Sequence, residues 1–528
     1  MAKLPSFALS DSAGFSHTFP AASARPILLC FVKADCPTCN LMMPLLEAAY
    51  GAFGDKIGVW AIGQEAKGNA ILVARHALSM PMLDDTALRV SFKYQIETVP
   101  TVILASADGE QQIKRIGFRK DEWQSLFVHL SHQTQLPAPE IDLGSYPEWR
   151  PGCGSRSVEP GIAERLQAEA EDSPLRARRI EIAPSDDEFE FMFDQGLTDG
   201  LPVVPPTPQR VLRMLKGTQR GAQQVVAVVP PNMAPATVEK VAVNAVMAGC
   251  KPEYMPVVIA ALSAVCTDEF NIHGVMATTW GATPCLVVNG PIRQRIGMNS
   301  GIQALGYGNR ANATIGRALK LILRNVGGAR PGGVERAALG SPAKFTMCFA
   351  EAEEVSPWQS LHVERGFKRE ESVVTVFALE GPRGIADQIS RTARALSTSF
   401  GLALESVWHP KVHPYGDVLL VICPEHVETL KHDGWTKADI RARIQEVTAR
   451  PLRDLLRDDE CGEGIPLARF GAGGPTAEQL AQRIPKFISP ANIHIVVAGG
   501  DAGKFSAIFG GWVSGPTGSI AVSRKIEE

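Results

Sequence analysis

Residues 27–39 read ILLCFVKADCPTC, and this stretch decides how the first part of the chain folds. The continuous apolar run at 27–32 predicts a buried β-strand, and the run at 40–47 predicts a helix. Cys36 and Cys39 would then lie at the N-terminus of that helix, where the positive end of the helix dipole stabilises a thiolate and lowers its pKa. The C-x-x-C spacing occurs in zinc sites and in redox sites. No second pair of Cys or His ligands lies nearby, so the strand-to-helix context favours redox chemistry.

Three proline and turn motifs accompany the two cysteines: Pro44 in the predicted helix, Val99-Pro100-Thr101 before an apolar run, and Asp108-Gly109 as a hairpin turn. Together with the dithiol they resemble the thioredoxin superfamily, specifically its redoxin or TlpA-like branch, over residues 1–133. The resemblance implies that Cys36 attacks disulfides and that Cys39 resolves the mixed disulfide. It also implies that Pro100 lies in a loop beside the dithiol that receives extended substrate backbone.

Three positions depart from patterns found in that superfamily. Asp35 stands where a tryptophan precedes the first cysteine, and its carboxylate opposes a thiolate unless Lys33 offsets it. Cys30 replaces the buried acid of many members, so proton removal from Cys39 lacks its usual carboxylate. Lys33 also occupies the place of the threonine expected before a peroxidatic Cys36, which disfavours a thiol peroxidase.

The composition of the 528 residues is that of ordinary globular domains, with 45% apolar and 21% charged residues. The net charge of −3 gives no reason to expect nucleic acid or an anionic membrane as a partner. No apolar run approaches the ~18 residues of a membrane span, and no secretory h-region follows the start, so we expect a cytoplasmic protein. Ten cysteines in this length do not make a disulfide scaffold.

The composition changes twice along the chain. We expect a thioredoxin-like domain at 1–133, a linker with a Gly/Pro-rich segment at 134–177, and an α/β enzyme domain at 178–528. Strand-like and helix-like runs alternate in the large domain, which indicates a layered α/β fold. Cys153 lies in the Gly/Pro-rich segment, and two interpretations of it stay open. It is either a chance linker thiol or a third redox thiol that relays between Cys36 and the rest of the chain.

Four stretches of the large domain resemble an uncharacterised bacterial family associated with UGSC-type (seleno)proteins: Asp199–Thr207, Ala242–Cys250, Arg310–Arg317 and Leu361–Phe367. The similarity spans about residues 190–528. It implies an enzyme-like domain with a tie to thiol or selenol chemistry, and it supplies no reaction. Cys250, at the end of the second stretch, is a further candidate for a redox relay.

A glycine-rich loop in the large domain, from Gly297 to Gly308, opens a predicted helix, with Asn312 as the expected N-cap. Exposed backbone N–H groups together with Arg310 and Arg317 would hold a carboxylate or a phosphate. Asn299, from the same loop, is a further candidate for substrate binding. Lys504 is another, because it follows a predicted strand and a second glycine loop.

Candidates for proton transfer come from two other polar stretches. His273 lies among small residues, hydroxyls and an aromatic that suggest a pocket wall, and a satisfied core or turn histidine is the alternative. Glu354 and His362 belong to a run of carboxylates, a His and an Arg. Such a run could supply a general acid and base or ligands for a hard metal, and a solvated charged loop is the alternative explanation.

The leading hypothesis is a thiol–disulfide oxidoreductase domain fused to an α/β enzyme domain that acts on an anionic small molecule, with the dithiol recycling oxidised thiols. One alternative is a lyase or hydrolase that uses the dithiol to bind a thiophilic metal or a sulfur product. Another is a redox-regulated binding protein or chaperone. The expected partners are the anionic substrate and a thiol reductant or reductase, and homo-oligomerisation stays open. The sequence specifies no cofactor, and the identity of any metal ion stays open.

Overall fold

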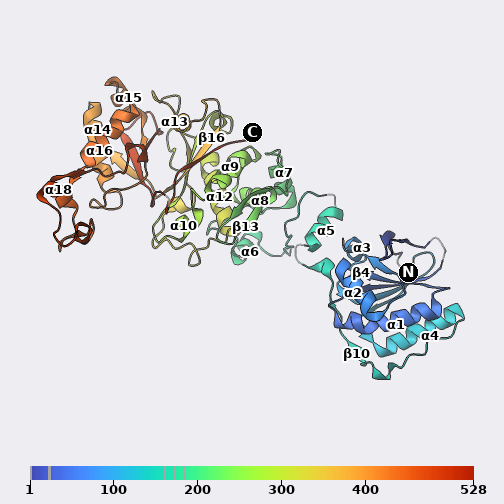
Figure 1. Cartoon of the computed structure of the whole chain (residues 1–528). Helices are drawn as coiled ribbons and strands as arrows, with labels where there is room; N and C mark the ends of the chain where they lie inside the picture. Colours follow the sequence, from blue (N-terminus) through green and yellow to red (C-terminus); the bar gives the residue numbers. More distant parts are fainter. Residues whose placement is uncertain are drawn as a thin grey trace. The chain divides into compact units, whose positions relative to one another are not determined.

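The computed structural model describes residues 3–21, 25–159, 162–170, 173–183, 185–515 and 517–527. The chain divides into two compact units, Met1–Ile180 and Glu181–Glu528 (Figure 1). The first unit therefore extends well past residue 133, where we expected the thioredoxin-like domain to end. The reason is that two short strands within the expected linker, 149–150 and 153–154, pair with strands of the first unit.

A five-stranded sheet, in the order β5-β4-β3-β7-β8, forms the centre of the first unit. Its strands are β3 (Ile27–Val32), β4 (Gly58–Gly63), β5 (Met82–Asp84), β7 (Thr101–Ala105) and β8 (Gln111–Ile116). β3 is the middle strand, parallel to β4 and antiparallel to β7, and all of its residues are buried. A strand covered on both faces needs a continuous apolar run, and the strand predicted at 27–32 is confirmed.

Helix α1 (Pro37–Phe53) begins directly after the turn that follows β3, and it contains Pro44. α1 packs beside α4 (Lys120–Thr134), as Figure 1 shows, and beside α2 (Ala66–His76). A hairpin of β1 (Phe7–Ser10) and β2 (Ser16–Phe19) precedes the sheet. The central strand, the dithiol turn and the flanking helices make the thioredoxin-like fold that the sequence predicts.

The chain beyond α4 continues along the first unit. β10 (Trp149–Arg150) pairs with β9 (Phe118–Arg119), and β11 (Cys153–Gly154) pairs with β6 (Thr98–Val99). The short helices η1 (Leu143–Ser145) and η2 (Arg156–Val158) flank these strands, and α5 (Ile162–Ala170) follows. We call residues 149–158 the β10–η2 segment.

Two four-stranded mixed sheets form the framework of the second unit. The first, in spatial order, is β15 (Cys348–Ala350), β14 (Thr283–Asn289), β16 (Val373–Leu379) and β23 (Val522–Lys525). The second is β17 (Arg383–Ala386), β22 (Phe505–Gly510), β18 (Val418–Ile422) and β21 (Ile493–Val497). Side chains from both sheets, among them Phe377 and Phe509, share one apolar cluster. This mixture of strands and helices is the α/β class that the sequence predicts.

Helices surround the sheets of the second unit. The longer ones are α7 (Pro208–Leu215), α8 (Val238–Ala248), α9 (Met255–Val265), α12 (Arg310–Asn325), α14 (Ala393–Glu405), α15 (Pro424–His432) and α16 (Lys437–Thr448). α12 packs against α8 and α9, and α14 packs against α16. The N-cap expected at Asn312 is wrong, because Asn309 caps α12 and accepts a 3.0 Å hydrogen bond from the Asn312 backbone N–H. No helix within the described residues is long and apolar enough to cross a membrane.

Candidate functional site

Cys36 and Cys39 lie at the start of α1, where backbone N–H groups point out of the helix. Cys36 is the N-cap, and its sulfur accepts a 3.3 Å hydrogen bond from the backbone N–H of Cys39. Its sulfur also lies 3.5 Å from the carbonyl oxygen of Val99. The Val99–Pro100 peptide bond is cis, and Pro100 leads into β7. The structure thus brings the dithiol, the helix terminus and the Pro100 loop together.

The two sulfurs of the dithiol have opposite electrostatic environments. The pKa of Cys36 is lowered to about 5, chiefly by the Cys39 thiol and with a further contribution from the Cys153 thiol, although burial opposes the shift. Burial raises the pKa of Cys39 well above its usual value, and its hydrogen bond to Cys36 adds to this shift. At neutral pH the pair therefore holds a thiolate on Cys36 and a proton on Cys39.

The other side chains that we expected to influence the thiolate have limited effects. Lys33 and Asp35 form an ion pair at 3.5 Å, and the Asp35 side chain is 77% exposed, so solvent screens its charge. Cys30 is buried in β3, and burial raises its pKa, so it remains a neutral thiol. Among the described residues, no group of three or more His, Cys, Asp or Glu side chains is arranged to hold a metal ion.

Comparison with known proteins identifies relatives of the N-terminal part. Residues 1–113 match the AhpC/TSA family. The chain is 32% identical over 108 residues to the thiol-disulfide oxidoreductase ResA of Halalkalibacterium halodurans, which is 20% of this chain and 61% of ResA. It is 28% identical over 123 residues to the methylamine utilization protein MauD of Paracoccus versutus, which is 23% of this chain and 61% of MauD. The chain thus spans about three fifths of the length of these curated relatives.

Two solved structures are also similar to parts of the chain. StoA from Bacillus subtilis is 22% identical over 24% of this chain and 99% of its own, with a TM-score of 0.21. Peroxidoxin BcpB from Mycobacterium tuberculosis is 14% identical over 25% of this chain and 95% of its own, with a TM-score of 0.23. The first unit is thus a thioredoxin-like domain whose residues 1–113 match the AhpC/TSA family and whose relatives include a thiol–disulfide oxidoreductase, and the family match covers none of the second unit.

The candidate residues of the glycine-rich loop and of α12 already have partners within the protein. The Asn312 amide donates to the Asn299 carbonyl at 2.8 Å, and its oxygen accepts from the Asn299 backbone N–H at 3.0 Å. Arg310 instead donates to a backbone carbonyl at 2.9 Å. Arg317 holds Asp199 in a bidentate ion pair with distances of 2.7 and 2.8 Å. The Arg317 charge is therefore already balanced, and the two asparagines serve to shape the loop.

Glu354 and His362 lie beside a half-buried ionic cluster. Arg293 is its cation, and it contacts Glu353 at 3.0 Å and Glu354 at 2.9 Å. The hydrogen bonds from Arg293 lower the pKa of Glu354. Burial lowers the pKa of His362, whose Nδ1 lies 3.0 Å from the Ser360 hydroxyl. At neutral pH, Glu354 is thus ionised and His362 is uncharged, which suits neither to act as a general acid.

The three remaining candidates are scattered. His273 is exposed on α10 (Ile272–Ala277), and Lys504 lies half-buried just before β22. Cys250 is buried in the second unit, and burial raises its pKa to about 12, so it stays protonated at neutral pH. Within the described parts of the chain, no hydrogen bond or ion pair joins any of them to Glu354 or His362.

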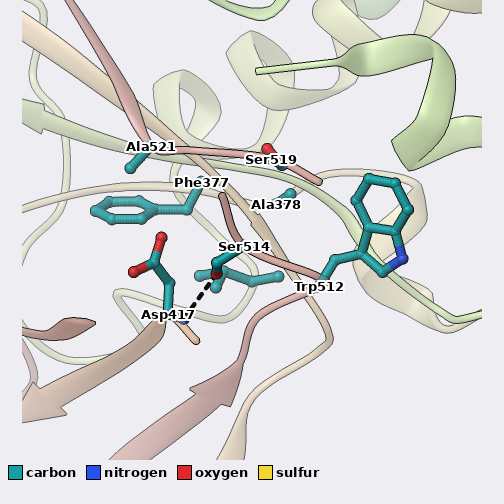
Figure 2. A pocket seen from close by; sticks show the side chains of 8 residues that line it. Phe377, Ala378, Asp417, Trp512, Ser514, Ser519 and Ala521 are labelled. Atoms are coloured by element: carbon teal, nitrogen blue, oxygen red, sulfur yellow. Dashed lines mark hydrogen bonds between the residues drawn. The ribbon is translucent and has the colours of Figure 1, made fainter. Parts of the chain in front are cut away.

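Figure 2 shows a small hollow in the second unit, where Phe377 and Trp512 lie near Asp417 and Ser514. The Asp417 backbone N–H donates to the Ser514 hydroxyl at 2.9 Å. The volume of about 10 Å³ is at the limit for one water molecule. This hollow is therefore too small for a substrate.

A larger cavity, of about 350 Å³, lies between the glycine-rich loop, α12 and β15. Gly306, Tyr307 and Asn312 line it together with Phe349 and Phe509, and no charged side chain does. Apolar walls with a few polar groups are typical of small-molecule sites. The glycine-rich loop that the sequence indicates therefore borders a cavity. The cavity has no charged side chain in its lining that could hold an anion.

A third cavity, of about 190 Å³, is lined by charged side chains that sequence reasoning missed. Lys320 of α12 is buried there, and its amine donates to the Thr283 hydroxyl. Burial lowers the pKa of Lys320 well below its usual value, and the charge of Lys344 lowers it further. Lys344 itself pairs with Glu335 at 2.9 Å. Arg324 Nε is buried and has no hydrogen-bond partner among the described residues.

One of these residues carried a signal in the sequence. Lys320 is the only charge in the run Ala318–Leu323, and a helix that is apolar on all sides is a buried helix. A lysine in such a helix must be buried with it, which is a rare and informative situation. Nothing local marks Lys344 or Arg324, because only tertiary packing brings them to the cavity.

Proposed function

We propose that the first unit is a thiol–disulfide oxidoreductase in which Cys36 is the nucleophile and Cys39 the resolving thiol. The observation that carries the proposal is the position of Cys36 as the N-cap of α1, where its sulfur accepts a hydrogen bond from the Cys39 backbone N–H. The pKa values shift in opposite directions there, to about 5 for Cys36 and upward for Cys39. The shifts divide the roles, because a thiolate attacks at once and a thiol must first lose its proton.

The reaction proceeds by two exchanges. The Cys36 thiolate bonds to one sulfur of a substrate disulfide and expels the other sulfur as a thiolate. The Cys39 thiol then loses its proton and attacks the Cys36 sulfur, which releases the second substrate sulfur and leaves a Cys36–Cys39 disulfide. A thiol reductant or reductase returns two electrons and one proton to the pair, which restores the Cys36 thiolate and the Cys39 thiol. Pro100 flanks the exchange, because it follows Val99, whose carbonyl oxygen lies 3.5 Å from the Cys36 sulfur.

Reduction of insulin by the full chain, with a thiol reductant present, tests this function. We expect Cys36→Ser to reduce insulin no faster than the reductant alone. We expect Cys39→Ser/Cys153→Ala, which lacks both neighbouring thiols, to accumulate a mixed disulfide on Cys36. Cys266→Ser, at a half-buried thiol of the second unit, is the matched control and keeps the wild-type rate. A Cys36→Ser protein with the wild-type rate would refute the proposal.

We further propose that the second unit binds an anionic small molecule in the cavity around Lys320, and that the dithiol recycles thiols oxidised in its reaction. Three basic side chains, Lys320, Arg324 and Lys344, line that cavity. Its two acids are already paired, Glu335 with Lys344 and Asp199 with an arginine of α12. A bound anion would raise the pKa of Lys320, so its binding would take up a proton.

Calorimetric titration of the full chain with oxalate, malonate and inorganic phosphate tests the anion site. Proton uptake is expected as a dependence of the binding heat on the ionisation enthalpy of the buffer. Lys320→Met should weaken binding about tenfold, since it removes a charge-assisted hydrogen bond. Lys431→Met, at an exposed lysine of α15, should leave binding unchanged. Equal affinities of the two variants would exclude this cavity as the site.

A further inference from the structure

The β10–η2 segment adds an extended strand beside the dithiol. β11 pairs antiparallel with β6, and Cys153 stands opposite Val99 in the register. Val99 is also the residue whose carbonyl oxygen lies 3.5 Å from the Cys36 sulfur. This pairing brings Cys153 close to the nucleophile, and its thiol lowers the pKa of Cys36.

The segment fits closely on the N-terminal side of Cys153. The hydroxyl of Thr38, in the first turn of α1, donates to the Pro151 carbonyl at 2.6 Å. A Cβ atom on Gly152 would lie 2.8 Å from the Val99 carbonyl oxygen. Only glycine therefore lets the two backbones approach this closely.

Buried polar contacts anchor the segment on the C-terminal side of Cys153. The Ser155 backbone N–H donates to the Glu97 carbonyl at 2.8 Å. Gln64 donates to the Ser155 hydroxyl at 2.7 Å and accepts from the Arg156 backbone N–H at 3.0 Å. An unpaired buried polar group destabilises the folded protein. These bonds therefore hold the segment in one register.

The segment covers the nucleophile, so an external disulfide reaches Cys36 only when the segment moves away. Cys36 has 0% solvent exposure, although a nucleophile must be reached by the disulfide that it attacks. An extended chain that adds to a strand edge and places its sulfur on Cys36 is what a disulfide-bearing peptide would also do. We propose that the β10–η2 segment occupies the substrate position of the first unit and that Cys153 is its internal exchange partner. This inference rests on the oxidoreductase function proposed above.

The internal exchange conserves atoms and electrons. Reaction with a disulfide substrate leaves the unit with a Cys36–Cys39 bond and a Cys153 thiol. The Cys153 thiol loses its proton and attacks the Cys36 sulfur, so that the Cys36–Cys153 bond forms and the Cys36–Cys39 bond breaks. Cys39 departs as a thiolate and takes up a proton. One disulfide and one thiol are present before and after, so the step needs no oxidant or reductant.

Trapping in the full-length Cys39→Ser variant tests the exchange. Oxidised glutathione first forms a disulfide with Cys36 and releases one glutathione thiol. The Cys153 thiolate should then displace the second glutathione, and peptide mapping without reductant should find Cys36 joined to Cys153. Cys39→Ser/Cys153→Ala should instead keep glutathione on Cys36. A Cys39→Ser protein that retains glutathione on Cys36 overturns the inference, whereas a Cys36 that never reacts overturns the oxidoreductase function itself.

A pair of neighbouring glycines tests whether the segment occupies the substrate position. Gly152→Ala should push the segment away from Val99, whereas a Cβ on Gly154 meets no atom within 4 Å. We expect Gly152→Ala to raise the rate of Cys36 alkylation and the rate of insulin reduction several-fold, and Gly154→Ala to change neither. Equal rates in both variants would show that the segment does not restrict access to Cys36.

Discussion

The Thr38 hydroxyl donates a 2.6 Å hydrogen bond to the Pro151 carbonyl. Thr38 lies in the first turn of α1, beside Cys36, and Pro151 lies in the β10–η2 segment. The bond therefore joins the helix that activates the nucleophile to the segment that covers it. Movement of the segment is coupled in this way to the end of the helix at which the thiolate is stabilised.

Thr38→Val should uncover Cys36 more often, because valine keeps the shape of the side chain and removes the donor. One such hydrogen bond contributes about 1 kcal/mol, which corresponds to about a fivefold change in the equilibrium between covered and uncovered forms. We expect alkylation of Cys36 by iodoacetamide to accelerate by that factor. Thr134→Val is the control, since its hydroxyl bonds to the Leu130 carbonyl within α4. An unchanged rate in Thr38→Val would contradict the coupling.

The pH profile of Cys36 alkylation should reveal the contribution of Cys153. In the wild type the rate should rise with the thiolate fraction, with a midpoint at the Cys36 pKa of about 5. Cys153→Ala removes a donor to that sulfur, so the midpoint should move to higher pH. Ultraviolet absorbance of the thiolate provides a second measurement. The same midpoint in both proteins would show that Cys153 does not stabilise the thiolate.

Ionisation of Cys36 should also stabilise the fold at high pH. Its pKa falls from 9.0 to about 5 on folding, so the native state releases a proton that the unfolded chain keeps between those values. The stabilisation is complete above about pH 9, decreases as the pH falls, and is lost below about pH 5. Urea unfolding of Cys36→Ala should therefore show a deficit in unfolding free energy, relative to the wild type, that grows from pH 5 to pH 9. A deficit independent of pH would contradict the shift.

Lys320→Met should stabilise the second unit while it weakens anion binding. Burial lowers the pKa of Lys320 from 10.5, so the wild-type unfolding free energy should rise with pH from the lowered pKa up to about 10.5. Methionine removes the cost of burying an amine and with it this rise. We expect a gain of about 1–2 kcal/mol at neutral pH, as is common when a functional polar group is replaced. Lys431→Met serves as the exposed control, and a destabilised Lys320→Met protein would indicate a structural lysine.

Arg293→Leu should destabilise the second unit strongly. The Arg293 side chain is 7% exposed, and it contacts Glu353, which is 12% exposed, at 3.0 Å. Its removal leaves a nearly buried carboxylate without its cation, which costs about 3–5 kcal/mol. Urea unfolding measures this loss, and Arg524→Leu, at an exposed arginine of β23, should cost little. Similar stabilities of the two variants would mean that solvent already screens the cluster.

Sequence reasoning succeeded where short-range rules are sufficient. The strand at 27–32 and the helix after it depend on consecutive residues, and so does the position of Cys36 at the helix end. It failed at the N-cap of α12, because Asn309 and Asn312 are equally good capping residues and the packing of the preceding loop selects the first.

The functional residues of the second unit are harder to predict from the sequence, because polar composition does not reveal which distant side chain a residue will contact. Arg317 has the right charge for an anion site, yet Asp199 neutralises it. Lys320 was overlooked within an apolar helix, although its burial beside Thr283 and Lys344 makes it the more unusual group. These pairings join residues that are far apart in the chain, so the local sequence pattern does not predict them.

The sequence by itself determined that a thiolate forms at the start of α1, because the helix end and the C-x-x-C spacing are properties of adjacent residues. Only the tertiary structure decided that Cys153 meets that thiolate. The meeting depends on pairing β11 with β6, although β7, β8 and α4 lie between them in the chain. Backbone hydrogen bonds and a close fit at Gly152 balance the entropic cost of bringing these distant segments together. Such a balance is a property of the assembled unit, and the Gly/Pro-rich composition of the segment alone predicts a linker.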